Sequence, residues 1–489
     1  MDAGQRHCCQ SFCLKPRAAE GSGARAEEKE MQQSKDGVDA ADVDVEDVAT
    51  DNPAGRNDVQ HGFRQWITVL LGLLVTVLFS GPIFGWASWQ PMLEEDGVYL
   101  DLCPDDEPLC PERSSRMVFL YTVGQMAAII GLAVVSFIAD KAGPLFLLAV
   151  GGTGTTAGML VMGLGMRSAD SDVLGVSTVL IGVGGASLIM HAMKLAFIVP
   201  PRHFAVVMTF SNCLIDASAV VPVGFYQTFR LGFSRRSIFI FYGALCFLLT
   251  TLLALSWCGP SLRTLKARNA AEVAASADAT SKHPRLHGLT VRRQCASVEF
   301  AFALVLFVTQ VFTSNCYLGS NKLLLESLGD AETDYTYVQI FTALLPASSV
   351  CAPLYSWLLS KKGFVVTFFV VILLNIIWNS VALMSLLELQ VISFIAFTNY
   401  RALLYAAAFT FLGHSFGNRT FGTMNGLISL ATGSVSFLIW PLVDLSQQLY
   451  GNFRAVNALL LLLALPFIVM TFQLSGHLRR YPEGDVRSS

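Results

Sequence analysis

The sequence has few charged side chains for its length. Of its 489 residues, 14% are charged and 53% are hydrophobic, whereas soluble domains carry about 25% charged residues. So few charges cannot cover the surface of a water-soluble protein of this size. The net charge of −3 also gives no basic excess for binding nucleic acid, so no nucleic-acid partner is expected.

The sequence also lacks the motifs of an enzyme. It shows no metal-spaced cluster of His, Cys and Asp, no nucleophile elbow and no glycine loop that holds phosphates. We therefore expect no catalytic activity, metal, cofactor or direct ATP drive. Residues 1–62 lack an apolar signal core and become acidic at "DGVDAADVDVEDVATD", a composition that predicts a disordered cytoplasmic tail.

Long apolar runs are what the sequence has instead. A run of about 20 apolar residues crosses roughly 30 Å of hydrocarbon, and a backbone in lipid must form its own hydrogen bonds as a helix. The sequence therefore predicts an all-α, multi-pass membrane protein with twelve transmembrane helices. The predicted spans are Trp66–Trp89, Arg116–Ile138, Leu145–Met166, Val173–Ile198, Phe204–Thr228, Arg236–Trp257, Val298–Leu318, Tyr335–Leu359, Phe364–Leu386, Gln390–Leu412, Thr420–Val443 and Phe453–Ser475.

A polar stretch, residues 259–296, divides these spans into two sets of six. It is basic, and basic loops stay in the cytoplasm, so both termini are expected on that side. The predicted parts are an N-terminal bundle at 63–258, the linker at 259–296, a C-terminal bundle at 297–475 and a tail at 476–489. In the first outer loop, "LCPDDEPLC" favours a disulfide between Cys103 and Cys110, with two free thiols as the alternative.

The two halves share a short repeat. "SFIADKAGPLFLL" and "SWLLSKKGFVVTF" each join the second and third spans of their half. Three residue types recur in register, at Ser136/Ser356, Lys141/Lys361 and Gly143/Gly363. Two matched six-helix bundles are typical of a pseudo-symmetric transporter with its site near the bilayer midplane; the alternative is chance similarity between short loops.

The loop in the first half resembles a family motif. "IADKAGPL" is similar to the motif that joins the second and third helices in the major facilitator superfamily, with Asp140, Lys141 and Gly143 at its acidic, basic and glycine positions. The second basic position of the motif is occupied by Pro144. The resemblance implies two six-helix bundles that this loop latches together on the cytoplasmic side, so these three residues are candidates for gating.

A narrower resemblance covers most of residues 63–475. "FSGPIFGWASWQPMLEEDGVY" and "YRALLYAAAFTFLGHSFGNRTFGTMNGLISL" resemble the sodium-independent L-type amino-acid transporters of solute carrier family 43 and the related apicomplexan amino-acid transporters. This implies facilitated uptake of neutral amino acids. We expect large, branched or aromatic ones to be moved by alternating access, by a monomer in the plasma membrane or alternatively the vacuolar membrane. One branch carries purine nucleobases, so these remain an alternative substrate.

Polar residues three or four positions apart share a helix face and are candidates to line a central site. These candidates are Tyr121, Gln125, Asn212, Gln310, Ser314, Asn425, Arg401 and Tyr405. The alternative for the uncharged ones is hydrogen bonding between helices. Gly81 and Gly85, on either side of Pro82, indicate either backbone exposed to substrate or close helix packing.

Charges inside the spans need a reason, because a charge at mid-membrane costs about 2.5–3.5 kcal/mol. For Arg401 two readings stay open: its guanidinium binds a substrate carboxylate, with Tyr405 closing the pocket, or it pairs with Asp216. Asp216 and His191 are candidates for gating or proton coupling, which would make the protein a proton symporter. Lys194 is expected to reach towards the membrane surface. A membrane sensor that no longer transports is the alternative from another class.

Overall fold

The computed structural model describes residues 53–103, 111–166, 172–277, 286–287, 289–333, 336–439, 441–442 and 454–480. All regular secondary structure in these ranges is helical. Most of the predicted N-terminal tail and Cys110 lie outside them. Cys103 is disulfide-bonded, but its pairing with Cys110 stays a prediction.

The helices follow the predicted spans with several breaks. The first half contains α1 (Pro53–Phe79), η1 (Pro82–Gly85), α2 (Trp86–Glu95), η2 (Leu100–Leu102), α3 (Pro111–Leu164), α4 (Val173–Lys194), η3 (Leu195–Phe197), α5 (Pro201–Ala217), η4 (Ser218–Val220), α6 (Val221–Arg230) and α7 (Arg235–Trp257). The middle stretch contains α8 (Pro260–Ala277) and α9 (Val291–Cys295). The second half contains α10 (Val298–Ser327), η5 (Asp330–Thr333), α11 (Thr336–Ala347), η6 (Ser348–Cys351), α12 (Ala352–Trp357), η7 (Leu358–Lys362), α13 (Gly363–Ala382), α14 (Gln390–Phe416), α15 (Asn418–Ser436), α17 (Arg454–Ala464) and α18 (Pro466–Arg480).

Nine helical stretches in the described residues are long and apolar enough to cross a membrane. Two of them, Arg116–Leu164 with 49 residues and Thr336–Ala382 with 47 residues, each cover two of the predicted spans. They are interrupted by Gly143 (φ 80°, ψ −179°) and Gly363 (φ 82°, ψ 176°), a conformation open to glycine and strained for other residues. The glycine of the repeat therefore has the same backbone conformation in both halves. Helix α15 is not among the nine because its Asn, Arg and Thr residues lower its mean hydropathy.

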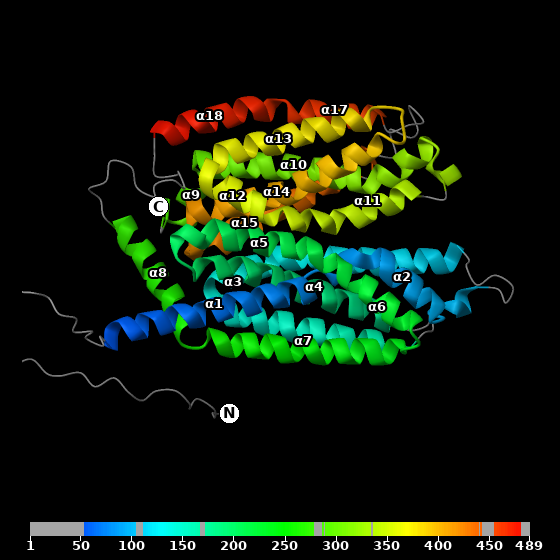
Figure 1. The fold of residues 1–489 in the computed structure, drawn as a ribbon, viewed down its shortest axis with the longest axis horizontal. Coiled ribbons are helices and arrows are strands. Elements are labelled where there is room, and N and C mark those ends of the chain that lie inside the picture. The colour runs from blue at the N-terminus through cyan, green and yellow to red at the C-terminus, as the bar shows by residue number, and fades with distance from the viewer. Residues whose placement is uncertain are drawn as a thin grey trace, which may run out of the picture. The chain divides into compact units, whose positions relative to one another are not determined.

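The two halves meet along two seams, one formed by α3 of the first half and the other by α5 (Figure 1). Helix α3 packs against α15, and α5 packs against α14 and α12. The first contact is very close: a Cβ on Gly422 would lie 2.3 Å from the carbonyl oxygen of Ser136, and one on Gly426 would lie 3.2 Å from that of Ala133. Small residues one turn apart let helix backbones approach in a membrane.

The predicted linker contains a helix of 18 residues, α8. Figure 1 places α8 and α9 at the end of the bundle opposite to α2, α6 and α11. The turns at Gly143, Gly363 and Gly417 lie at the same end. We call it the latch end, because of the contacts between the halves that are described below. On the bundle flanks, α7, α13 and α18 expose Phe241 (70%), Leu373 (56%) and Phe472 (62%); such faces suit contact with lipid tails.

Candidate functional site

An ion pair between the halves lies at the middle of the bundle. Arg401 lies about 17 Å along α14 from its first residue, at 1.5 Å per residue, and its Nη2 is 3.4 Å from Oδ1 of Asp216 on α5. The two side chains are 20% and 16% exposed. The predicted alternative in which Arg401 pairs with Asp216 is therefore what the structure shows in this conformation.

Aromatic and polar side chains from both halves surround this pair. The guanidinium of Arg401 lies 5.7 Å from the ring centroid of Tyr405, and Tyr121 of α3 is within electrostatic range of it. Gln125 donates a hydrogen bond of 2.8 Å to the hydroxyl of Tyr121. The structure thus brings together five of the predicted residues, Arg401, Asp216, Tyr405, Tyr121 and Gln125.

Three short segments near Asp216 are 3-10 helices and interrupt the α-helices there. Segment η4 begins two residues after it, η1 of the first span packs on η4, and η6 of the second half packs on α5. A Cβ on Gly81 would lie 2.5 Å from Oγ of Ser218, and one on Gly85 would lie 2.3 Å from the carbonyl oxygen of Ala219. The two glycines therefore allow close helix packing; their role as substrate contacts stays a prediction.

Two polar contacts next to the pair escaped the sequence analysis. The hydroxyl of Ser349 in η6 donates to the carbonyl oxygen of Cys213 at 2.7 Å, which joins the halves. The hydroxyl of Tyr355 donates to Oδ1 of Asn399 at 2.6 Å. In the sequence, these residues carry no signal beyond being polar in an apolar run.

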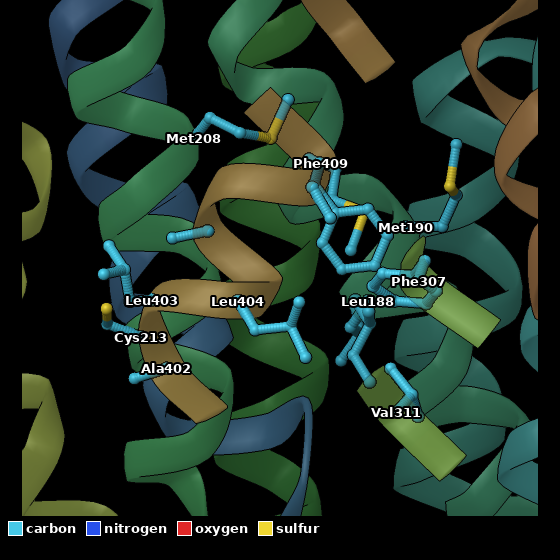
Figure 2. Packing of buried hydrophobic residues seen from close by; sticks show 14 of the residues in the cluster. Leu188, Met190, Met208, Cys213, Phe307, Val311, Ala402, Leu403, Leu404 and Phe409 are labelled. Atoms are coloured by element: carbon cyan, nitrogen blue, oxygen red, sulfur yellow. The ribbon is translucent and has the colours of Figure 1, made fainter. Parts of the chain in front are cut away.

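An apolar layer contributed by both halves separates the pair from the latch end. Figure 2 shows it, with Leu188 and Met190 of α4, Met208 and Cys213 of α5, Phe307 and Val311 of α10, and Ala402, Leu403, Leu404 and Phe409 of α14. Gly413 of α14 extends it, because a Cβ there would lie 2.6 Å from the ring of Phe204. This packing closes the middle of the bundle on that side.

Three of the predicted substrate-binding candidates form hydrogen bonds within a single half or are buried there. Gln310 accepts hydrogen bonds from Asn375 (2.5 Å) and from the hydroxyl of Tyr400 (3.0 Å), all in the second half. Asn212 bonds to the carbonyl of Met208, one turn earlier on its own helix. The hydroxyl of Ser314 is buried with no hydrogen-bond partner in the described part of the chain. Their proposed contact with substrate stays a prediction.

His191 lies away from the charge pair, against α7. Its Nε2 accepts a hydrogen bond of 2.9 Å from Nε1 of Trp257, and the imidazole is 1% exposed. Asn425 lies towards the latch end, where it donates to the hydroxyl of Ser136 at 3.1 Å. Both are buried in helix contacts, so neither the coupling role of His191 nor the substrate role of Asn425 gains support from these contacts.

Asp140 and Lys194 form the centre of the latch end. The carboxylate of Asp140 accepts from the backbone N–H groups of Gly422 (2.9 Å) and Thr423 (2.7 Å). The ammonium of Lys194 lies 3.0 Å from Asp140 and donates to the carbonyl oxygen of Asn418 at 2.9 Å. Lys194 is 3% exposed, so the expectation that it reaches towards the membrane surface is wrong. Asp140 of the same half and the carbonyl oxygen of Asn418 in the other half stabilise its charge where it is. Lys141, in contrast, is exposed.

Helix α8 adds a second carboxylate to the start of α15. Glu272 accepts from the backbone N–H groups of Asn418 (2.9 Å) and Arg419 (3.2 Å), and Asn269 accepts from the side-chain amide of Asn418 at 2.7 Å. Glu272 thus caps the start of α15, where unpaired N–H groups and the helix dipole favour negative charge, and Asp140 binds N–H groups about one turn further along. The sequence analysis missed Glu272, because nothing in a polar linker marks one carboxylate as a cap.

Solved structures of transporters resemble this fold, whereas no family model matches the sequence. The proton:xylose symporter XylE of the major facilitator superfamily, bound to 6-bromo-6-deoxy-D-glucose, aligns with a TM-score of 0.60 at 14% identity over 83% of this chain and 95% of its own. The human organic anion transporter MFSD10 aligns with a TM-score of 0.56 at 14% identity over 83% and 99%. The transporter FucP in its outward conformation aligns with a TM-score of 0.52 at 12% identity over 82% and 97%. The chain is therefore a multi-pass membrane protein with the fold of the major facilitator superfamily.

Proposed function

We propose that this protein carries neutral amino acids with large, branched or aromatic side chains across a membrane, by facilitated alternating access. The observation that carries this proposal is the partly exposed pair of Arg401 and Asp216, one from each half, beside tyrosine rings at mid-bundle. A guanidinium offers a planar fork to a carboxylate. The sequence resemblance to L-type amino-acid transporters points to the same substrates.

The fold alone does not select a substrate, since one fold hosts many functions. The proteins of similar structure are named for xylose, fucose and organic anions. We propose that alternating access operates by breaking and remaking the latch end, which is closed in this structure through Asp140, Lys194 and Glu272. The plasma membrane and a monomer remain our expectations for location and assembly.

Uptake by the full chain in liposomes tests this function. Radiolabelled leucine is the probe, and the twenty amino acids, the purine nucleobases and xylose are the competitors. We expect competition by large neutral amino acids and none by nucleobases or xylose. Competition by nucleobases or xylose alone contradicts the proposal, and binding of leucine without accumulation indicates a sensor.

Proton-coupled symport is the second candidate, because Asp216 is a largely buried carboxylate within reach of the substrate region. The same liposomes decide between the two. Facilitated transport gives equal initial rates with and without a proton ionophore, across a range of external pH. A rate that follows the imposed proton gradient assigns coupling to the protein instead.

A further inference from the structure

The pair of Arg401 and Asp216 differs from the enclosed ion pairs of the described bundle, Asp140–Lys194 and Arg235–Asp96. Arg235 and Asp96, both in the first half, approach to 2.8 Å and are 6% and 7% exposed. Arg401 and Asp216 are farther apart, at 3.4 Å, and are two to three times as exposed. A tight, enclosed pair stabilises one arrangement of helices. A loose pair with open sides leaves room for another group.

Part of the hydrogen-bonding capacity of this pair is also not used. An arginine offers five N–H donors, yet Nε of Arg401 is buried without a partner. Among the described residues, no hydrogen bond ends on the carboxylate of Asp216, and the 3.4 Å contact exceeds the usual length of a charge-assisted bond. Charges taken out of water need good geometry and further hydrogen bonds to offset the loss of solvation. In this conformation the contact between the two charges is long, and Asp216 gains no further hydrogen bond from the described residues.

We propose that Arg401 and Asp216 together bind both charged ends of a zwitterion: the guanidinium binds the carboxylate of the substrate and Asp216 binds its ammonium group. This inference rests on the proposed function and assigns Asp216 as a second specificity residue. The zwitterion replaces one loose ion pair with two closer ones. It adds no net charge to the site, so no ion has to enter with it.

The geometry also links binding to movement of the halves. Asp216 belongs to α5 of the first half and Arg401 to α14 of the second. A zwitterion held between them connects the halves, and a ligand with one charged end contacts only one half well. A ligand can shift a conformational equilibrium only through contacts that differ between the two states. Both charges of the substrate are therefore needed for transport as well as for affinity.

The rings next to the pair indicate what the rest of the substrate is. The ring of Tyr405 lies 5.6 Å from Phe307 and 6.1 Å from Phe409, and the ring of Trp86 lies 6.1 Å from Tyr121, between centroids. Such rings offer apolar and edge-to-face contacts to a branched or aromatic side chain. None of these five side chains carries a charge that could form an ion pair with a third charged group on the substrate.

Three ligands that differ in one charged group test the inference on the wild-type chain. They are leucine, its decarboxylated amine (isopentylamine) and its 2-hydroxy acid (2-hydroxyisocaproate). Inhibition of leucine uptake and the thermal shift of the purified protein are both measured. We expect each analogue to bind at least about tenfold more weakly than leucine, because each leaves one buried charge unpaired. Equal binding of leucine and either analogue overturns the inference.

Substitutions at Asp216 assign the ammonium contact. In Asp216→Asn, we expect the preference for leucine over the 2-hydroxy acid to disappear while the preference over the amine remains. Asp216→Glu keeps the charge and should keep both preferences at lower affinity, which covers the case in which the asparagine variant folds poorly. Unchanged preferences in a folded Asp216→Asn protein overturn the assignment.

The matched control is Asp96→Asn, which breaks an ion pair that lies within one half. We expect a lower yield or melting temperature and the wild-type order of the three ligands. Binding measured by thermal shift does not require transport, so the proposed function and the binding of both charged ends can be contradicted independently of each other. A wild-type protein that neither binds nor moves leucine contradicts the proposed function. A protein that moves leucine without discriminating the analogues contradicts only the pairing of both charges.

Discussion

The guanidinium of Arg401 lies at a depth where a charge is costly, and the carboxylate that neutralises it comes from the opposite half. Both charges stand out in the sequence because apolar runs contain so few, so their pairing was a natural expectation. The neighbours Ser349, Tyr355 and Asn399 were not predictable. Which faces of distant helices meet is decided by packing of the whole bundle, and a polar residue in one span carries no information on its partner in another.

Replacing Arg401 with lysine keeps the charge and removes the planar fork. Because a lysine ammonium is a point charge that cannot bind a carboxylate in the same two-pronged way, we expect leucine uptake to fall at least about tenfold with unchanged surface expression. Uptake and surface biotinylation are the measurements. Arg236→Lys, at an exposed position of α7, is the control. Normal uptake by Arg401→Lys contradicts a carboxylate-binding role.

At the scale of elements, the turn before α15 depends on a glycine for two separate reasons. Gly417 has φ 75° and ψ 178°, and a Cβ there would lie 2.8 Å from the carboxylate of Glu272. Gly143 has nearly the same backbone angles with no atom within 4 Å of its Cβ position. Comparing alanine variants at the two positions therefore separates the cost of backbone strain from the cost of the collision with Glu272.

Gly417→Ala should destabilise the protein more than Gly143→Ala does. Both add backbone strain of about 1–3 kcal/mol, but only the former displaces Glu272 from two N–H groups, hydrogen bonds to a charged group that are worth about 1.5–3 kcal/mol. Melting temperatures in detergent, read from intrinsic fluorescence, compare the two variants. Equal losses would show that Glu272 is not held at this turn.

The sequence predicted the turns of the repeat better than it predicted the caps. Lys and Gly recur in register, and Gly143 and Gly363 indeed share one backbone conformation. The helical linker α8, Glu272 and the partner of Lys194 were missed. A helix start accepts any nearby carboxylate, so the sequence of the helix does not say which one it receives.

At the scale of the whole molecule, Asp140 links the first half to the second through α15. Asp140→Asn removes the charge to which the backbone N–H groups of Gly422 and Thr423 donate, and a hydrogen bond to a charged group is worth about 1.5–3 kcal/mol. These bonds join the halves when the latch end is closed, so we expect the population to shift away from the closed conformation; the Asp140–Lys194 pair lies within the first half and does not distinguish the two states. Hydrogen exchange at residues 418–423 should accelerate.

Asp172→Asn is the control for that experiment, because it removes the Arg116–Asp172 pair, which lies within the first half and is 29% and 78% exposed. We expect no change in exchange at residues 418–423 for this variant. Unaltered exchange in Asp140→Asn as well would show that the contact does not set the conformational equilibrium. The two-bundle fold itself was predictable, since it needs only apolar runs and their count; the equilibrium between its states depends on these few contacts.

The two seams between the halves are chemically unequal, although the repeat relates them. In the repeat, Ser360 stands at the position that Asp140 has in the first half. It belongs to η7, which packs against α5, and its buried hydroxyl has no hydrogen-bond partner in the described part of the chain. Helix α5 begins at a proline that follows another proline, so it offers fewer N–H groups for an acidic cap. When the halves separate at the latch end, the electrostatic contacts that must break therefore lie only on the α3–α15 seam. The charged contact of the α5 seam, between Asp216 and Arg401, lies at mid-bundle, so the latch end of that seam can separate without breaking an ion pair among the described residues.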